Sequence, residues 1–213
     1  MTKVLLDRMC AAAALVLLLP LWFFIAVAIA WDDGLPILFR QTRIGRGNVP
    51  FQLLKFRSMR PRVPGPRITA GNDPRLTRVG AFLRRFKLDE LPQLWNVLKG
   101  DMSLVGPRPE VPAFVDFQDP TWQTVLQVRP GITDLASLVY RNEEEILCGQ
   151  NDPESYYRNE ILPAKLALNM HYLRSRSLWS DLKIILITMR YSFFPAGFHS
   201  SSISRMFLKQ ENS

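Results

Sequence analysis

The sequence predicts an α+β fold in which helices predominate. An uncharged apolar run lies near the N-terminus, two short strand patterns flank a glycine-rich turn, and several later segments repeat apolar residues at helical spacing. With 213 residues, the chain suits one domain plus an appendage. We place the boundary after residue 31, with residues 1–31 as a membrane-embedded segment and residues 32–213 as a domain that ends in C-terminal helices.

The apolar run extends from Cys10 to Trp31 and is long enough to cross a bilayer core, which needs about 20 helical residues. Ala28 and Ala30 resemble a secretory cleavage site, but the run exceeds the roughly 7–15 apolar residues of a signal peptide core. A spanning helix and a re-entrant helix, which leaves the membrane by the face it entered, are the remaining alternatives.

The charges around the apolar run favour the re-entrant alternative. Lys3 and Arg8 precede the run and a series of arginines follows it, whereas basic residues prefer the cytosolic side of a membrane. Pro20 removes a backbone donor near the middle of the run and leaves the carbonyl of Val16 without its helical partner. We therefore expect a membrane bend at Pro20, although proline also occurs in ordinary spanning helices.

The later segments predict a hairpin followed by helices. Strands are expected at 36–40 and 51–56, around a turn at 45–48, and residues 60–75 are expected to form a loop because Pro, Gly and Arg dominate them. The segment 122–129 fits either a helix or a strand. The aromatic residues of the last predicted helix suit a membrane interface as well as a core. Helices are predicted at 75–86, 89–99, 154–175 and 178–194.

The overall charge indicates an anionic partner. Lys and Arg number 27 against 19 Asp and Glu, which gives a formal net charge of +8. Nucleic acid, a phosphate-rich substrate and an acidic membrane face all suit this balance. Cys10 and Cys148 lie far apart and predict no disulfide, and the two histidines predict no zinc site.

Asp89 and Glu90 open a predicted helix and are the candidate catalytic residues. In the simplest interpretation, Asp89 caps the helix and Glu90 complements its dipole. In the alternative, the helix N-terminus binds an anion, and Arg84 holds phosphate oxygens. A carboxylate beside such cations stays ionised and can attack phosphorus, while an adjacent carboxylate can bind a divalent cation.

Two further basic segments suit the same chemistry. Lys55 and Arg57 lie at the end of a predicted strand, where side chains project toward a ligand. Arg108 lies between two prolines, in a stiff loop that aims its guanidinium group at a phosphate. Each of these charges alone would be an ordinary surface charge. Their recurrence in loops around one acidic pair indicates a site that cleaves a diphosphate.

Three stretches of the sequence resemble one known family, the bacterial sugar transferases or monotopic phosphoglycosyl transferases. The stretches are LFRQTRIGRGNVPFQLLKFRSM, DPRLTRVGAFLRRFKLDELPQLWNVLKGDMSLVGPRPE and RPGIT, and with the apolar segment they cover residues 1 to about 135. The resemblance implies a re-entrant membrane helix, interfacial amphipathic helices and a small mixed catalytic domain on the cytosolic face of the bacterial inner membrane.

The resemblance also implies a reaction. Asp89 matches the nucleophile, which takes a phosphosugar from a UDP-sugar, releases UMP and passes the phosphosugar to a polyprenyl phosphate, typically undecaprenyl phosphate. Glu90 matches its acidic partner, which holds Mg²⁺ or assists proton transfer, so the pair is the implied metal site. Arg84 matches a phosphate-binding arginine, and Arg108 matches the arginine of a proline-flanked loop. Such a step begins the synthesis of a surface glycan or glycoconjugate.

The sequence departs from the family pattern in three places that matter. Phe86 replaces a commonly small polar residue just before the acidic pair. Leu19 precedes the membrane proline where the family often has serine. After RPGIT the chain reads DLASLVYRNEEEIL instead of the commoner Gly-Leu-Trp-Gln continuation, so the donor sugar is left open.

Two other function classes compete with the enzyme. A non-catalytic basic protein that binds anionic lipid at the membrane surface would share the charge and the apolar segment. A nucleic-acid binder is favoured only by net charge, because no recognition motif is present. Release of UMP from a UDP-sugar distinguishes the enzyme from both.

Overall fold

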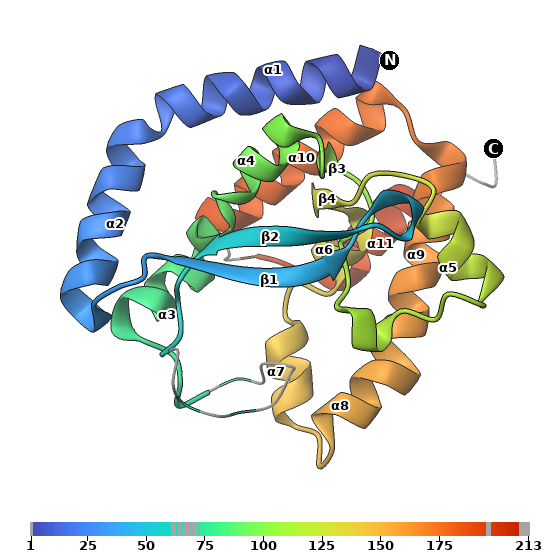
Figure 1. The fold of residues 1–213 in the computed structure, drawn as a ribbon. Coiled ribbons are helices and arrows are strands. Elements are labelled where there is room, and N and C mark those ends of the chain that lie inside the picture. Colours follow the sequence, from blue (N-terminus) through green and yellow to red (C-terminus); the bar gives the residue numbers. More distant parts are fainter. Residues whose placement is uncertain are drawn as a thin grey trace.

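The computed structural model describes residues 2–60, 63, 65, 71, 73–194 and 197–208, so most of the predicted loop 60–75 lies outside the described residues. The α+β fold dominated by helices is confirmed, with two small sheets (Figure 1). The elements in chain order are α1 (Thr2–Leu17), α2 (Leu19–Asp33), β1 (Leu38–Ile44), η1 (Arg46–Asn48), β2 (Pro50–Phe56), α3 (Arg78–Arg85), η2 (Leu88–Glu90), α4 (Gln93–Lys99), β3 (Ser103–Val105), η3 (Pro112–Phe114), α5 (Pro120–Val125), β4 (Gly131–Thr133), α6 (Leu135–Val139), α7 (Glu143–Cys148), α8 (Pro153–Tyr156), η4 (Tyr157–Ile161), α9 (Leu162–Ser175), α10 (Leu178–Phe193) and α11 (Ser200–Leu208).

The predicted hairpin is confirmed, but its first strand runs from Leu38 to Ile44 instead of from 36 to 40, and its second begins one residue earlier than predicted, at Pro50. β1 and β2 pair antiparallel, from Leu38 opposite Phe56 to Ile44 opposite Pro50. The turn between them needs two left-handed residues, and Gly47 and Asn48 have φ angles of 68° and 65°. Glycine adopts this conformation without strain, and asparagine tolerates it better than most residues.

A second, parallel pair of strands was not predicted. Ser103 of β3 lies opposite Gly131 of β4, and Val105 lies opposite Thr133. Strands of three residues carry too little periodicity to be recognised in a sequence. This pair matters for the site because its hydrogen bonds continue into the proline-flanked loop, where the Gly131 amide donates to the carbonyl of Pro107 at 3.0 Å.

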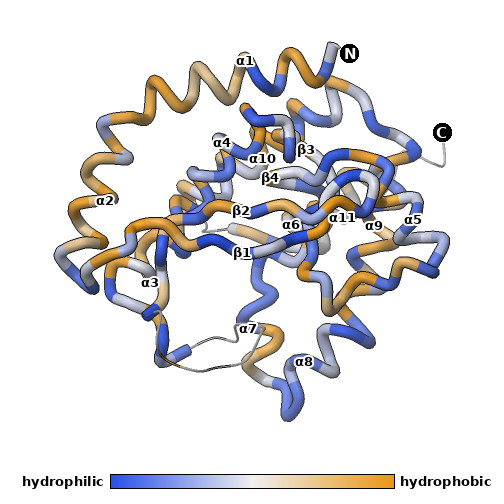
Figure 2. The backbone as a smooth tube through the Cα atoms, in the orientation of Figure 1, coloured by the Kyte–Doolittle hydropathy of each residue, from blue (hydrophilic) through white to orange (hydrophobic). Residues whose placement is uncertain are grey.

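The apolar segment forms two helices that meet at a bend. α1 ends at Leu17, α2 begins at Leu19 and the two axes differ by 63°, with Pro20 in the first turn of α2. None of the helices in the described part of the chain is by itself both long and apolar enough for a membrane span; α1 and α2 meet that condition only together, as this bent pair. In Figure 2 apolar residues predominate in α2 and the adjoining half of α1. Several are well exposed, among them Phe23 and Phe24 at 65% and 67%.

The bent pair is fastened to the domain by apolar and polar contacts. On α2, Ile25 and Ile29 are buried against Phe56 of β2 and Leu83 of α3. On α1, Ala11 packs against residues of β2 and α4. The Arg8 guanidinium donates to the carbonyl of Lys99 at the C-terminus of α4, at 2.9 Å. A cation is favourable there because the last carbonyls of a helix carry partial negative charge.

One predicted helix boundary near the acidic pair is wrong. The helix expected at 89–99 begins instead at Gln93, and residues Leu88–Glu90 form a short 3₁₀ turn before it. Pro92 precedes α4, and no side chain caps that helix. The interpretation of Asp89 as a helix cap is therefore incorrect, because a capping side chain accepts from a backbone amide of the first turn.

The other predicted helices are found with small shifts. The helix expected at 75–86 is α3, which begins later because Thr77 caps it by accepting from the Gly80 amide. The helix expected at 154–175 is α8 and α9 joined by the π-helical turn η4, and the helix expected at 178–194 is α10. The ambiguous segment 122–129 begins as the helix α5.

We expect Gly80→Ala to destabilise the fold. Gly80 lies in the first turn of α3, and a Cβ atom there would lie 2.0 Å from the carbonyl oxygen of Ser58. Because that neighbour is backbone, the helix must move, which costs about 1–3 kcal/mol or more. Urea unfolding measures the loss. Gly149→Ala is the matched control, since the nearest atom to its Cβ, the Ile146 oxygen, is 3.8 Å away. Equal stability of the two variants would contradict this packing.

Candidate active site

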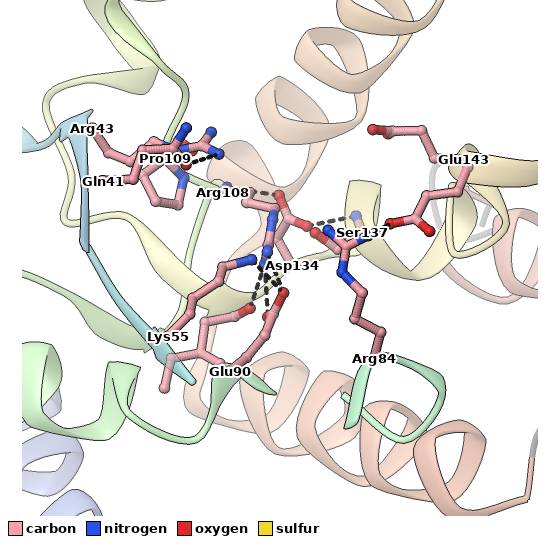
Figure 3. A network of polar contacts seen from close by, with 12 residues as sticks. Gln41, Arg43, Lys55, Arg84, Glu90, Arg108, Pro109, Asp134, Ser137 and Glu143 are labelled. Atoms are coloured by element: carbon pink, nitrogen blue, oxygen red, sulfur yellow. Dashed lines mark hydrogen bonds and ion pairs between the residues drawn. The ribbon is translucent and has the colours of Figure 1, made fainter. Parts of the chain in front are cut away.

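Glu90 lies at the centre of a buried cluster of charges (Figure 3). The Lys55 Nζ atom is 3.1 Å from Glu90 Oε1. Arg108 holds the same carboxylate with two nitrogens, NH1 at 3.1 Å from Oε2 and NH2 in a short contact with Oε1. A bidentate guanidinium–carboxylate pair fixes both groups in one plane. The structure thus brings together Lys55, Glu90 and Arg108, which the sequence analysis placed in one site.

The position of Arg108 is set by the parallel strand pair. The Arg108 amide donates to Asp134 Oδ2 at 3.0 Å, and its NH1 donates to the carbonyl of Ile132 at 3.2 Å. Asp134 is completely buried and also caps α6, where its Oδ1 accepts from the Ser137 amide. Asp134 was not predicted from the sequence as a site residue. The only signal available was its position directly after RPGIT, at the end of a strand too short to be predicted.

A second group of residues, also not predicted from the sequence, supports the proline-flanked loop from the side of β1. Arg43 of β1 donates to the carbonyl of Pro109 at 3.0 Å and lies 3.5 Å from Glu110 Oε2. The hydroxyl of Tyr157 donates to the other oxygen of Glu110. These contacts connect β1, the proline-flanked loop and η4, so Arg108 is held on both sides.

Asp89 precedes Glu90 in the chain but does not share its ion pairs. Lys87, two residues before it, has a left-handed φ of 57°, which turns the chain into the 3₁₀ segment. Asp89 is only 4% exposed, and its Oδ1 atom has no hydrogen-bond partner among the described residues. An unbonded carboxylate oxygen in a buried position is costly, and such groups in native proteins call for an explanation such as a catalytic role.

Burial and charge separate the pKa values of the two acids. Burial raises the pKa of Asp89 and the charge of Glu90 adds to this rise, while Lys55 offsets it only in part. For Glu90 burial acts in the same direction, but Arg108 and Lys55 outweigh it and hold its pKa well below the usual range. The expectation that cations near Arg84 favour ionisation of Asp89 is corrected, because burial of this carboxyl raises its pKa more than Lys55, Lys87 and Arg84 lower it. Two carboxyls with separated pKa values suit different tasks.

Two predicted phosphate-binding arginines have protein partners. Arg84 on α3 makes an ion pair with Glu144 on α7, at 3.2 Å. Arg57 is 4% exposed and donates to the carbonyls of Asp33 and Gly34 at 2.8 and 2.6 Å. The structure therefore directs Arg57 to the end of α2, whereas Lys55 reaches Glu90.

The acidic pair offers limited ligands for a metal ion. No group of three or more His, Cys, Asp or Glu side chains with metal-binding geometry occurs among the residues that the structure describes. Mg²⁺ commonly uses one or two carboxylates and completes its shell with water and substrate phosphates. The unpartnered Oδ1 of Asp89 fits that requirement. Glu90 fits it less well, because Arg108 and Lys55 already occupy its oxygens.

The sequence matches the family model described as "Bacterial sugar transferase" over residues 1–195. It is 42% identical over 193 residues to a UDP-glucose:undecaprenyl-phosphate glucose-1-phosphate transferase of Caulobacter vibrioides, a match that covers 88% of this chain and 68% of that protein. It is 37% identical over 190 residues to a UDP-N-acetylgalactosamine-undecaprenyl-phosphate N-acetylgalactosaminephosphotransferase of Aeromonas hydrophila, covering 87% and 42%. It is 37% identical over 192 residues to the exopolysaccharide production protein PSS of Rhizobium leguminosarum, covering 86% and 90%.

These matches define a sugar transferase. The small α+β domain and the acidic pair, with its lysine and arginine partners, agree with that class. The chain belongs to the bacterial sugar transferase family, as its motifs predicted. It spans less than half the length of the Aeromonas relative but most of the Rhizobium one.

Proposed function

We propose that this protein transfers a phosphosugar from a UDP-sugar to a polyprenyl phosphate, by way of a covalent intermediate on Asp89. The observation that carries the proposal is the contrast between the two acids of the pair. Glu90 is held by Lys55 and Arg108, whereas Asp89 is buried beside them with an unbonded oxygen. The names of the Caulobacter and Aeromonas relatives include both a UDP-sugar and undecaprenyl phosphate, which supports this choice of substrates.

In the first half-reaction, an oxygen of the ionised Asp89 carboxylate attacks the phosphorus that bears the sugar. The bond from this phosphorus to the bridging oxygen breaks, and UMP leaves with the electron pair. A carboxylate with a raised pKa is a better donor to phosphorus than an ordinary one once it is ionised. In this proposal Lys55 and Arg108, which Glu90 holds in place, offset the charge of the diphosphate oxygens.

In the second half-reaction, a phosphate oxygen of the polyprenyl phosphate attacks the same phosphorus. The bond to the Asp89 oxygen breaks, which restores the carboxylate and leaves the sugar joined to the lipid through a diphosphate. Dividing the transfer in this way lets one site serve a water-soluble donor and a membrane-bound acceptor in turn.

We further propose that Mg²⁺ assists the donor half-reaction. Asp89 would be its main protein ligand, with the donor diphosphate supplying other oxygens, and Glu90 would contribute by orienting Arg108. When bound, the ion would neutralise charge on the departing phosphate.

The proposal is tested with purified protein, a panel of UDP-sugars and Mg²⁺. We expect release of UMP with one donor or a few, and transfer of radiolabelled phosphosugar when undecaprenyl phosphate is added. A non-catalytic basic surface protein would instead bind vesicles of anionic lipid and release no UMP. Absence of UMP with every donor, under conditions where the Caulobacter relative is active, would reject the enzyme in favour of that alternative.

We also propose that α1 and α2 enter and leave the cytosolic face of the inner membrane. The 63° bend and the exposed apolar side chains of both helices support this topology. The test places single cysteines at Thr2 and Arg40 in a protein without Cys10 and Cys148. In intact spheroplasts we expect both to be protected from an impermeant thiol reagent, whereas a spanning segment would expose one of them.

We expect the paired change Phe23→Gln and Phe24→Gln to release the protein from membranes. Each ring is about two-thirds exposed on α2 and contributes roughly 1.5–3 kcal/mol when transferred out of water. The double variant should therefore lower the partition coefficient by at least about a hundredfold. Vesicle sedimentation measures this loss. Phe117→Gln, at an exposed ring outside these helices, is the matched control. Unchanged sedimentation of the double variant would contradict the embedding of α2.

A further inference from the structure

Gln93 is the first residue of α4 and has an unusual environment. Its side chain is completely buried, yet neither Oε1 nor Nε2 has a hydrogen-bond partner among the residues that the structure describes. A glutamine side chain offers two donors and one acceptor, and leaving all of them unsatisfied in a buried position is strongly unfavourable. Within the fold alone, an apolar side chain of similar size would be the better choice.

Asn96, one turn later on the same helix, shows how a structural amide is treated in this protein. Asn96 is 1% exposed. Its Oδ1 accepts from the Leu54 amide at 3.1 Å, and its Nδ2 donates to the Gln52 carbonyl at 2.8 Å. The two amides therefore differ in partners rather than in burial. Asn96 joins α4 to β2, whereas the Gln93 amide makes no hydrogen bond within the described structure.

The backbone places Gln93 on the same face as the acidic pair. Leu91 and Pro92 have right-handed helical angles, so the chain from η2 into α4 turns continuously in one sense. Bonds of the 3₁₀ type, such as Leu94 N to Leu91 O at 3.0 Å, connect the two segments. Side chains three positions apart share a face in a 3₁₀ turn, and those three or four apart do so once the chain becomes the α-helix α4. Gln93 stands three positions after Glu90 and four after Asp89.

Two neighbouring side chains on this face thus carry polar atoms without partners, Asp89 through Oδ1 and Gln93 through its whole amide. A phosphoryl group suits this pair, because the Asp89 oxygen can approach its electrophilic phosphorus while the Gln93 N–H groups face its oxygens. We propose that Gln93 is a further catalytic residue: its Nε2 donates a hydrogen bond to an oxygen of the phosphoryl group that Asp89 attacks. This inference rests on the proposed function and adds a residue to that site.

The hydrogen bond from Gln93 would stabilise mainly the transition state of the donor half-reaction. The amide is rigidly placed at the start of a helix, so it needs little reorganisation when charge builds on the phosphoryl oxygens. Its removal should therefore lower kcat more than it raises KM for the donor. A hydrogen bond to a charged group of this kind corresponds to a loss of about tenfold to a hundredfold in rate.

The test compares Gln93→Met with the wild type and with Asn96→Leu. For Gln93→Met we expect a kcat of UMP release lowered about tenfold to a hundredfold, with a midpoint of thermal unfolding equal to or above that of the wild type. Asn96→Leu should lower that midpoint, because it breaks bonds that the fold uses. This opposite behaviour separates a ligand-binding amide from a structural one.

Two results would overturn the inference. Gln93→Met with unchanged kcat would show that the amide does not contact the reacting group. A lowered unfolding midpoint for Gln93→Met, matching the loss in Asn96→Leu, would show a structural role such as binding a buried water. Either result leaves wild-type UMP release intact, whereas failure of the wild type itself to release UMP would count against the proposed function.

Discussion

Asp89→Asn is expected to abolish phosphosugar transfer without damaging the fold. The substitution keeps the shape of the side chain but removes the negative charge that would form the bond to phosphorus. Loss of a covalent nucleophile lowers the rate by at least about a thousandfold. The stability should be equal or higher at neutral pH. The folded state disfavours the ionised acid, since burial raises the pKa of Asp89, and a neutral amide removes that penalty.

Activity and stability are measured on the same preparation, by UMP release and by thermal unfolding. Asp116→Asn is the control, because Asp116 is an exposed acid whose replacement leaves the site unaltered. Wild-type protein incubated with donor alone should also carry a phosphosugar adduct on the peptide that contains Asp89. Transfer by Asp89→Asn at more than a few per cent of the wild-type rate would reject the assignment of this nucleophile.

The raised pKa of Asp89 also sets the direction of the pH profile. Only the ionised form of Asp89 attacks phosphorus, so the rate at low pH should rise with pH through the raised pKa of this group. The ascending limb should therefore lie above the ordinary range of an aspartate. A limb at or below that ordinary range would indicate that binding of the donor lowers the pKa of Asp89.

The sequence was most informative where a pattern is long or a residue type is chemically distinctive. The hairpin and the long helices α9 and α10 follow from periodicity, and a break near Pro20 follows from its missing backbone donor. The acidic pair was found because Asp89 and Glu90 stand among many arginines and lysines. Their family motifs then assigned roles that spacing alone left open.

The sequence was least informative about where individual side chains point and what they contact. Lys55 and Arg57 differ by two positions, and strand alternation would put them on one face. In the structure Lys55 of β2 reaches Glu90, whereas Arg57, the residue after β2, donates to the Gly34 carbonyl. Gln93 was missed for a similar reason, because a glutamine in a helix is ordinary until its burial and its missing partners are known. Such facts depend on tertiary contacts rather than on local pattern.

The contacts of Glu90 predict a second large effect. Glu90→Gln leaves the buried cations of Lys55 and Arg108 without their counter-charge, so the variant should lose about 3–5 kcal/mol of stability. Chemical unfolding at neutral pH measures this loss. Glu145→Gln, at an exposed acid on α7, is the control and should change stability by no more than about 0.5 kcal/mol.

The pH dependence and a double variant separate charge from packing in this effect. The pKa of Glu90 is lower in the folded than in the unfolded protein, so its stabilisation is present above the ordinary glutamate pKa and is lost as the pH falls through the folded value. The difference between wild type and Glu90→Gln should therefore shrink on acidification. Adding Arg108→Met to Glu90→Gln should recover part of the stability, because it removes one of the stranded cations. If Glu90→Gln were as stable as the wild type at neutral pH, the ion pairs would not hold Arg108 in place, and another contact, such as that with Asp134, would have to do so.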